Sequence, residues 1–153
     1  MVLYEDTRQQ VGKHKNVHLY CRQAGIKIIR QALNVGDYQI AGKGDISVDT
    51  KQSVIELAGN VFQEHERFRT ECLRAQECEI QLIILIEEQL PGGRLDNWRS
   101  PVSLDGKPLT RFDPAVLRKA MITMQREYGV KFRFCDARST GKQIIEYLKG
   151  ERK

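Results

Sequence analysis

The sequence lacks the patterns that build a disulfide-stapled or zinc-bound fold. Its four cysteines form no Cys-x-x-Cys pair, and none has a histidine at zinc-finger spacing. The three histidines, His14, His18 and His65, show no ligand spacing to one another. We therefore expect reduced cysteines, and histidines that serve the core or the surface rather than a metal.

Long apolar runs are also missing. The longest nearly continuous one, from Ile80 to Ile86, is far shorter than the roughly 20 residues of a membrane-spanning helix. The first residues lack the basic and then apolar order of a secretory signal. We expect an intracellular, soluble, cytoplasmic protein with no membrane partner.

Positive charge is present in excess. The 25 Lys and Arg residues outnumber the 20 Asp and Glu residues, which gives a net charge of +5. Such an excess favours a polyanionic partner such as nucleic acid. One basic loop contains Lys13 and Lys15, for which a DNA-backbone contact and a solvated charge cluster are both open.

The periodicity predicts one α/β domain over residues 1–153, with a mixed central β-sheet flanked by helices. Helices separated by strands, after an early hairpin, are typical of that architecture. The expected strands cover residues 2–6, 26–33, 46–51, 81–87 and 130–135, and the strand at 46–51 is the second strand of the hairpin. The expected helices cover residues 16–24, 54–77, 114–128 and 140–149. The strand at 81–87 is almost wholly apolar, so we expect helices on both of its faces.

The predicted hairpin carries the best candidate for a chemical site. If it folds about the turn signal at residues 41–44, Asp37 lies opposite Asp49. Lys51 then shares the strand face of Asp49, whereas Thr50 points to the core. Facing carboxylates repel each other and call for a cation, and hard oxygen ligands suit Mg²⁺ or Mn²⁺. The pattern is typical of a metal-dependent phosphodiesterase.

Each residue of this pattern also has a plainer interpretation. Asp37 could be an ordinary turn residue after Gly36, and Asp49 with Lys51 could be a same-face ion pair of little energetic value. Their occurrence together favours the site.

A long loop is expected at residues 89–112, which are rich in glycine and proline and show no periodicity. It holds the only tryptophan, Trp98, beside Arg99. Two interpretations are open. The loop could be a surface flap whose Trp98 packs back on the core, or it could contact phosphates with Arg99 and stack Trp98 on an exposed base.

With its flanking segments, the hairpin resembles the nuclease domain of the XPF family, within the PD-(D/E)xK or restriction-endonuclease-like superfamily. That family has a D-x-R-E strand, a G-D-[YF] strand, an E-R-K strand and a helix carrying R-F. The matching segments are Asp6-Thr7-Arg8-Gln9, Gly36-Asp37-Tyr38, Asp49-Thr50-Lys51 and Arg67-Phe68. The resemblance covers residues 2–88 well and is specific as an ordered set.

The resemblance implies a catalytic role for five residues. Asp37 and Asp49 would be the principal metal ligands, and the carbonyl of Thr50 would be a further ligand. Lys51 would be the catalytic lysine, and Asp6 an auxiliary acidic group at the same site.

The resemblance also implies contacts to DNA. Arg8 would support the site or touch a phosphate, and Arg67 would face the cleft from its helix. The sequence departs from the family's motifs at three places. Asp49 replaces the glutamate of the E-R-K strand, which shortens the carboxylate by one methylene but keeps the superfamily's (D/E)xK rule. Gln9 replaces the glutamate of the D-x-R-E strand, and the acidic residue expected four positions after the lysine comes one later, as Glu56.

The function implied is a Mg²⁺- or Mn²⁺-dependent DNA endonuclease that hydrolyses phosphodiester bonds in branched or structured duplex DNA, as in DNA repair and recombination. The form would be a stand-alone nuclease domain of bacterial or phage type. The alternative is a non-catalytic DNA-binding or scaffold module with the same fold, since the family includes inactive partner subunits. Relatives pair, so a homodimer is also implied.

Overall fold

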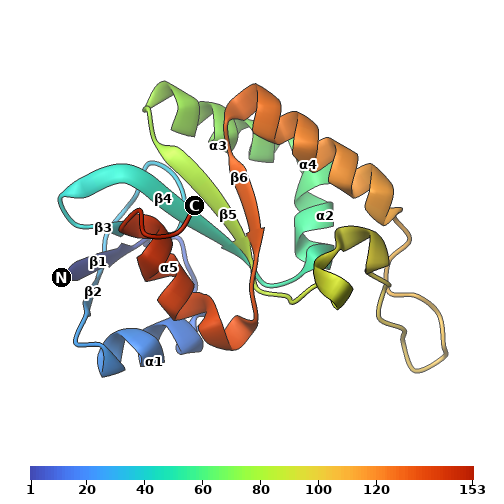
Figure 1. The fold of residues 1–153 in the computed structure, drawn as a ribbon, viewed down its shortest axis with the longest axis horizontal. Coiled ribbons are helices and arrows are strands. Elements are labelled where there is room, and N and C mark those ends of the chain that lie inside the picture. The colour runs from blue at the N-terminus through green and yellow to red at the C-terminus, as the bar shows by residue number, and fades with distance from the viewer.

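A six-stranded mixed sheet between two helical layers organises the computed structural model, which describes residues 1–153 (Figure 1). The strands are β1 Val2–Glu5, β2 Lys27–Arg30, β3 Tyr38–Ile40, β4 Lys43–Lys51, β5 Gln81–Ile86 and β6 Lys131–Phe134. The helices are α1 Lys15–Gln23, α2 Val54–Phe62, α3 His65–Glu77, α4 Pro114–Tyr128 and α5 Thr140–Leu148. The predicted α/β class with a mixed sheet is confirmed.

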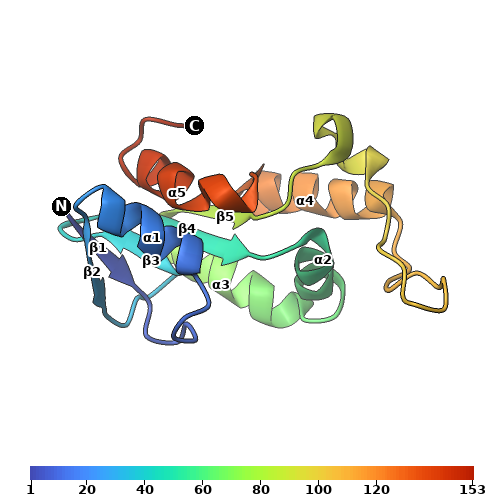
Figure 2. The same cartoon turned by 90° about the horizontal axis from the view of Figure 1, so that it is seen from below.

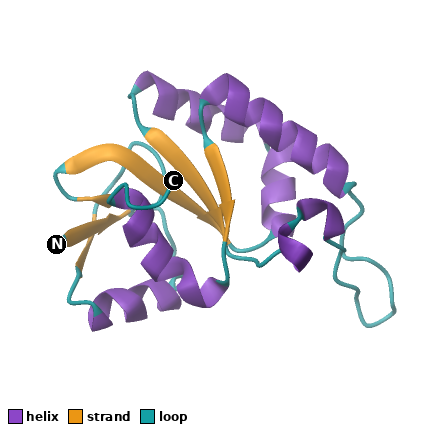
Figure 3. Ribbon diagram, in the orientation of Figure 1, coloured by secondary structure: helices purple, strands orange, loops and turns teal.

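The strands run in the order β2-β1-β3-β4-β5-β6. The β1–β3 and β3–β4 pairs are antiparallel, and the β1–β2, β4–β5 and β5–β6 pairs are parallel. Parallel neighbours need crossover connections, and the helices supply them. The hairpin β3–β4 therefore lies at the centre of the sheet (Figure 3).

Each face of the sheet has its own core. Helices α1 and α5 cover one face, and α2, α3 and α4 cover the other (Figure 1). Along β5, Leu82, Ile84 and Ile86 belong to the second core while Ile83 and Leu85 belong to the first. The alternation follows from the two-residue period of a strand and confirms that β5 is buried on both faces.

The hairpin pairs near the site as predicted but turns earlier. Tyr38 lies opposite Val48, the register that sets Asp37 against Asp49. Farther out, Ile40 pairs with Lys43, so the register shifts between the two pairs. Two residue steps along β3 are thus matched by five along β4, a bulge-type irregularity of the kind that bends a strand and increases its twist.

The single helix predicted over residues 54–77 is wrong, because the chain forms two helices, α2 and α3, with a break at Gln63 and Glu64. The N–H groups of both residues donate to the carbonyl of Gly59, at 2.9 and 3.0 Å. Glu64 has φ −110° and ψ 34°, outside the helical region. The break redirects α3 across the sheet.

The predicted loop at residues 89–112 is only partly irregular. Its first half forms two short 3₁₀ turns, Pro91–Gly93 and Leu95–Asn97, and buries Leu95 and Trp98. Its second half folds into a small hairpin closed by a bridge between Val102 and Pro108. This hairpin projects from the body of the molecule (Figure 2). None of the helices is both long and apolar enough to cross a bilayer.

Candidate active site

A cavity of about 280 Å³ opens where the centre of the sheet meets α2 and α3. Six carboxylate side chains line it against three cationic ones, although the whole chain carries a net charge of +5. The acidic residues are Asp6, Asp37, Asp49, Glu56, Glu64 and Glu71, and the basic ones are Arg8, Lys51 and Arg67. The cavity therefore concentrates negative charge in a basic protein.

Asp37 enters the cavity from the start of β3 and is 5% exposed. Its Oδ2 accepts the N–H of Thr50 at 2.8 Å and the Thr50 hydroxyl at 2.7 Å, and its Oδ1 accepts the side-chain amide of Gln9. Burial and the charge of Asp49 raise the pKa of Asp37 well above its ordinary value, against the hydrogen bonds of Thr50. Thr50 is buried, as predicted, and its hydroxyl in addition binds Asp37.

Asp49 and Lys51 form a buried ion pair, with 3.0 Å between Oδ2 and Nζ. The ammonium group also lies 5.5 Å from the ring centroid of Phe68, on α3. Burial alone would lower the pKa of Lys51, but the charges of Asp49, Asp37 and others outweigh it and hold that pKa above its ordinary value. Lys51 is therefore a cation at neutral pH.

Two buried side-chain oxygens have no hydrogen-bond partner, and both line this cavity: Asp49 Oδ2, whose ion pair with Lys51 lacks hydrogen-bond alignment, and Asn60 Oδ1. Buried oxygens are nearly always satisfied. Because Lys51 Nζ already lies 3.0 Å from Asp49 Oδ2, the oxygen that calls for a cation or donor is Asn60 Oδ1. No three Asp, Glu, His or Cys side chains converge into a preformed metal cage. Mg²⁺ does not need one, since it binds through one or two carboxylates, water and substrate phosphate. The residues present fit a divalent cation.

The backbone of Thr50 faces the same part of the site. Its N–H donates to Asp37, and the N–H and C=O of one strand residue point to the same side. The carbonyl predicted as a ligand therefore lies on the side of Asp37.

Asp6 is almost fully buried and supports its neighbours. Its Oδ1 accepts the N–H of Leu33 at 2.9 Å, and its Oδ2 pairs with Arg8 Nε at 2.7 Å. Its own N–H donates to the carbonyl of Asp37 at 2.8 Å. Asp6 thus holds Arg8, whose side chain is 62% exposed, at the mouth of the cavity.

The residues predicted to contact DNA separate into two groups. Arg8 and Arg67 line the cavity, and the side chain of Arg67 is 88% exposed. Lys13 and Lys15 line a neighbouring depression beside Gln52, which follows Lys51 in the chain.

The prediction that Trp98 stacks on a base is corrected by the structure. Trp98 is 4% exposed, and its ring stacks on that of Phe112 with 5.0 Å between the ring centroids. Its indole N–H donates to the carboxylate of Glu88 at 2.6 Å. Apolar burial and a satisfied N–H stabilise this position. Arg99 stays exposed, but it does not line the active-site cavity.

Sequence reasoning missed the part that Gln9 and Glu71 play in the site. The carbonyl oxygen of Gln9 lies 2.6 Å from His14 Nε2, so the Gln9 amide links His14 to Asp37. Glu71 lines the cavity from α3 and accepts the N–H of Gly36 at 3.1 Å. Its position four residues after Arg67 places both on one helix face, and that spacing could have identified it.

The displaced acidic residue Glu56 still reaches the cavity. It lies in the first turn of α2, where its carboxylate accepts the N–H of Gln52 at 2.7 Å. Ile55, at the position where the family places its acid, instead lines an apolar groove on the other side of α2.

Comparison with known families decides the assignment. The model of the ERCC4 domain matches residues 6–148. The chain belongs to the ERCC4 domain family. The predicted XPF-type resemblance is confirmed, and it extends beyond residue 88 through α5. No curated protein matches this ERCC4 domain.

Two solved structures share its fold. One is XPF from Aeropyrum pernix, with a TM-score of 0.68 and 20% identity over 100% of this chain and 62% of that one. The other is XPF from Aeropyrum pernix in complex with DNA, with a TM-score of 0.67 and 21% identity over 98% of this chain and 64% of that one. This ERCC4 domain therefore spans less than two thirds of the XPF chains that it resembles.

Proposed function

We propose that the chain is a divalent-metal-dependent endonuclease that hydrolyses phosphodiester bonds in branched or otherwise structured DNA. The supporting observation is that an ERCC4 domain brings Asp37, Asp49 and Lys51 into one acidic cavity. The buried Asn60 Oδ1, a cavity oxygen with no hydrogen-bond partner, supports a bound cation there.

Asp37 and Asp49, with the Thr50 carbonyl, are the proposed holders of Mg²⁺ or Mn²⁺. When bound, such an ion supplies Lewis-acid polarisation of the phosphate and a water of lowered pKa. Asp37 is oriented for this task by Thr50 and Gln9, which donate to both of its oxygens.

Lys51 is the proposed stabiliser of the charge that develops on the phosphoryl oxygens. Its raised pKa keeps it protonated at neutral pH, so it acts as a fixed cation rather than as a general base. The ion pair with Asp49 and the contact with Phe68 hold its ammonium group in place.

Arg8 and Arg67 at the rim are the proposed contacts to the DNA backbone, because both are exposed and both border the cavity. Lys13 and Lys15 extend this surface. Backbone contacts of this kind give salt-dependent and sequence-independent affinity, which suits an enzyme that recognises the shape of DNA.

The test is cleavage of fluorescent fork, flap and four-way-junction DNA with Mg²⁺, Mn²⁺ or EDTA. We expect cutting with either metal and none with EDTA. Asp49→Asn and Lys51→Ala should each lower the rate by about 100-fold or more, since each removes a charge from the reacting centre. Arg67→Ala should weaken DNA binding and its salt dependence.

The outcome also separates the alternative. DNA binding without cutting in any metal would support a non-catalytic scaffold, to which the substitution at Gln9 gives some weight. Cutting that survives Asp49→Asn would contradict the assigned site.

A further inference from the structure

The two unsatisfied oxygens of the cavity lie on different walls. Asp49 comes from β4, and its side chain is 8% exposed. Asn60 comes from α2, on the helical side. They are the only buried side-chain polar atoms of the chain without a hydrogen-bond partner, and both are oxygens. Asp49 Oδ2 lies 3.0 Å from Lys51 Nζ, whereas Asn60 Oδ1 has neither a hydrogen bond nor a charged partner.

Glu71 adds a carboxylate from the same helical side. Gly36 anchors one of its oxygens at 3.1 Å, but no Lys, Arg or His lies within ion-pair distance of it. The two nearby cations are engaged elsewhere, Arg8 with Asp6 at 2.7 Å and Lys51 with Asp49 at 3.0 Å. Glu71 is therefore held in position at the cavity without being neutralised.

Asp37, in contrast, is already well supplied with donors. Three hydrogen bonds reach its two oxygens, from Gln9 and from the N–H and hydroxyl of Thr50. A carboxylate has about four lone-pair sites, so Asp37 keeps about one for a bond to the metal. The remaining oxygen ligands must come from another wall of the cavity.

We propose that Asn60 and Glu71 are further cation ligands, so that a divalent metal is held between β4 and the α2–α3 pair. Amide and carboxylate oxygens are the donors that Mg²⁺ and Mn²⁺ accept. The inference rests on the proposed function in that it concerns the same cation. It differs in assigning ligands to the helical wall of the cavity. Gln9 does not serve as such a ligand, because its amide group donates to Asp37.

A plain structural role for Glu71 makes a different prediction. If Glu71 only anchors Gly36, then Glu71→Gln should change little, because the glutamine oxygen can accept the same N–H. If Glu71 is a ligand, the same substitution removes a negative charge that the metal needs. It also relieves repulsion within the acidic cavity, so the metal-free protein should melt at a higher temperature.

The experiment measures Mn²⁺ binding to the whole chain without DNA, by calorimetry and by electron paramagnetic resonance. We expect Glu71→Gln to weaken binding by about 10-fold or more, and Asn60→Asp to tighten it by adding a charged oxygen at the same place. Glu66→Gln is the matched control, because Glu66 lies exposed on α3 outside the cavity and its substitution should leave the Kd unchanged.

The outcomes distinguish this inference from the proposed function. An unchanged Kd in Glu71→Gln, or a Kd that does not fall in Asn60→Asp, overturns the inference. If Asp49→Asn nevertheless abolishes binding, the proposed function stands. A wild-type chain that binds no Mn²⁺ overturns both. Circular dichroism checks folding, and if Glu71→Gln does not fold, Asn60→Asp decides alone.

Discussion

Glu5 shows how one buried charge holds the entrance to the site in place. It is 2% exposed and accepts hydrogen bonds of 2.7 Å from His18, Arg30 and the hydroxyl of Tyr38, the residue that follows Asp37. Burial alone would raise the pKa of Glu5, but the hydrogen bonds of His18 and Tyr38 and the charges of His18 and Arg30 hold it below its ordinary value. The ionised form is therefore part of the folded structure.

A carboxylate whose pKa is lower in the folded than in the unfolded state stabilises the protein at pH values above its unfolded-state pKa. This contribution to stability is lost as the pH falls through its folded-state pKa. We predict that Glu5→Gln lowers the free energy of unfolding by about 2–3 kcal/mol at pH 7. The difference should shrink as the pH falls through the lowered pKa of Glu5, because the wild-type side chain then also becomes protonated. Urea denaturation of both proteins at pH 7, 5 and 3.5 measures it. A difference independent of pH would mean that packing, not charge, is responsible.

The grouping of Asp37, Asp49 and Lys51 could be predicted from the sequence, because a strand has a strict two-residue period and a hairpin has a simple register. The contact between Gln9 and Asp37 could not be predicted from the sequence, because it joins residues 28 apart and Gln9 lies in a loop with no periodicity. The sequence also could not show that Thr50 binds Asp37, since a threonine on the core face of a strand packs as an apolar residue in most sheets. Such polar contacts depend on rotamers rather than on pattern.

At the scale of elements, two helix caps allow a matched comparison. Ser53 caps α2 by accepting the N–H of Glu56 at 3.1 Å, and Asp113 caps α4 by accepting the N–H of Ala115 at 2.9 Å. Of these two helices, α2 carries side chains of the active-site cavity and α4 carries none. The two caps therefore offer similar stabilisation with different expected consequences for function.

We predict that Ser53→Ala and Asp113→Ala each lower the free energy of unfolding by about 1 kcal/mol. Ser53→Ala should also lower the cleavage rate, because α2 positions Glu56 and Asn60 at the cavity. Asp113→Ala should leave the rate unchanged. Thermal melts and cleavage assays on both variants test this, and equal losses of activity would contradict the link between the α2 cap and the site.

The buried position of Trp98 predicts a spectroscopic result. Because its indole stacks on Phe112 and donates to Glu88, it is not available to a base. Saturating DNA should therefore leave the emission maximum and intensity of this only tryptophan nearly unchanged, while anisotropy of labelled DNA reports binding. Strong quenching by bound DNA would show that the loop opens and would restore the stacking interpretation.

The α2–α3 break shows where pattern reasoning reaches its limit. Val61 and Phe68 are both buried and seven residues apart, the spacing of an unbroken helix. The break at Gln63 and Glu64 involves no proline or glycine, so no local signal announces it. The ends of α4, in contrast, coincide with local signals, an N-capping aspartate at Asp113 and a left-handed glycine at Gly129.

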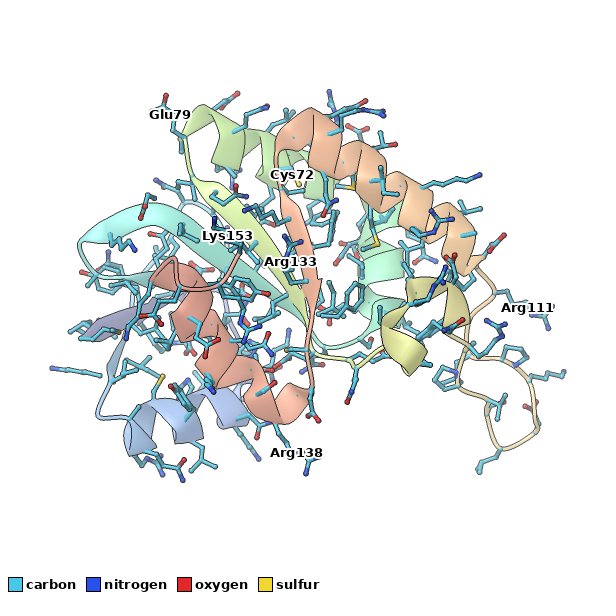
Figure 4. The ribbon with its side chains drawn as sticks, viewed as in Figure 1. Cys72, Glu79, Arg111, Arg133, Arg138 and Lys153 are labelled. Atoms are coloured by element: carbon cyan, nitrogen blue, oxygen red, sulfur yellow. The ribbon has the colours of Figure 1, made fainter.

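At the scale of the whole molecule, apolar exposure is uneven. Ten large hydrophobic side chains are exposed, and six of them gather on α2, the projecting hairpin and α4. These six are Phe62, Val102, Leu104, Leu109, Val116 and Ile122. A groove of about 600 Å³ between α2 and residues 109–116 runs beside the hairpin, with Arg111 pointing outward (Figure 4). Clustered apolar surface of this kind marks an interface.

The dimer expected from the XPF resemblance stays a prediction, and this surface is where we place it. In the dimer that we predict, a two-fold axis seats the hairpin of each copy in the groove of the other. We predict that Val116→Asp converts a dimer to a monomer in light scattering after size exclusion. Leu19→Asp is the control, because Leu19 is 50% exposed, as Val116 is 51% exposed, but lies on α1 over the opposite face of the sheet. A wild-type chain that is monomeric at every concentration, or a dimer lost equally in both variants, would contradict this placement.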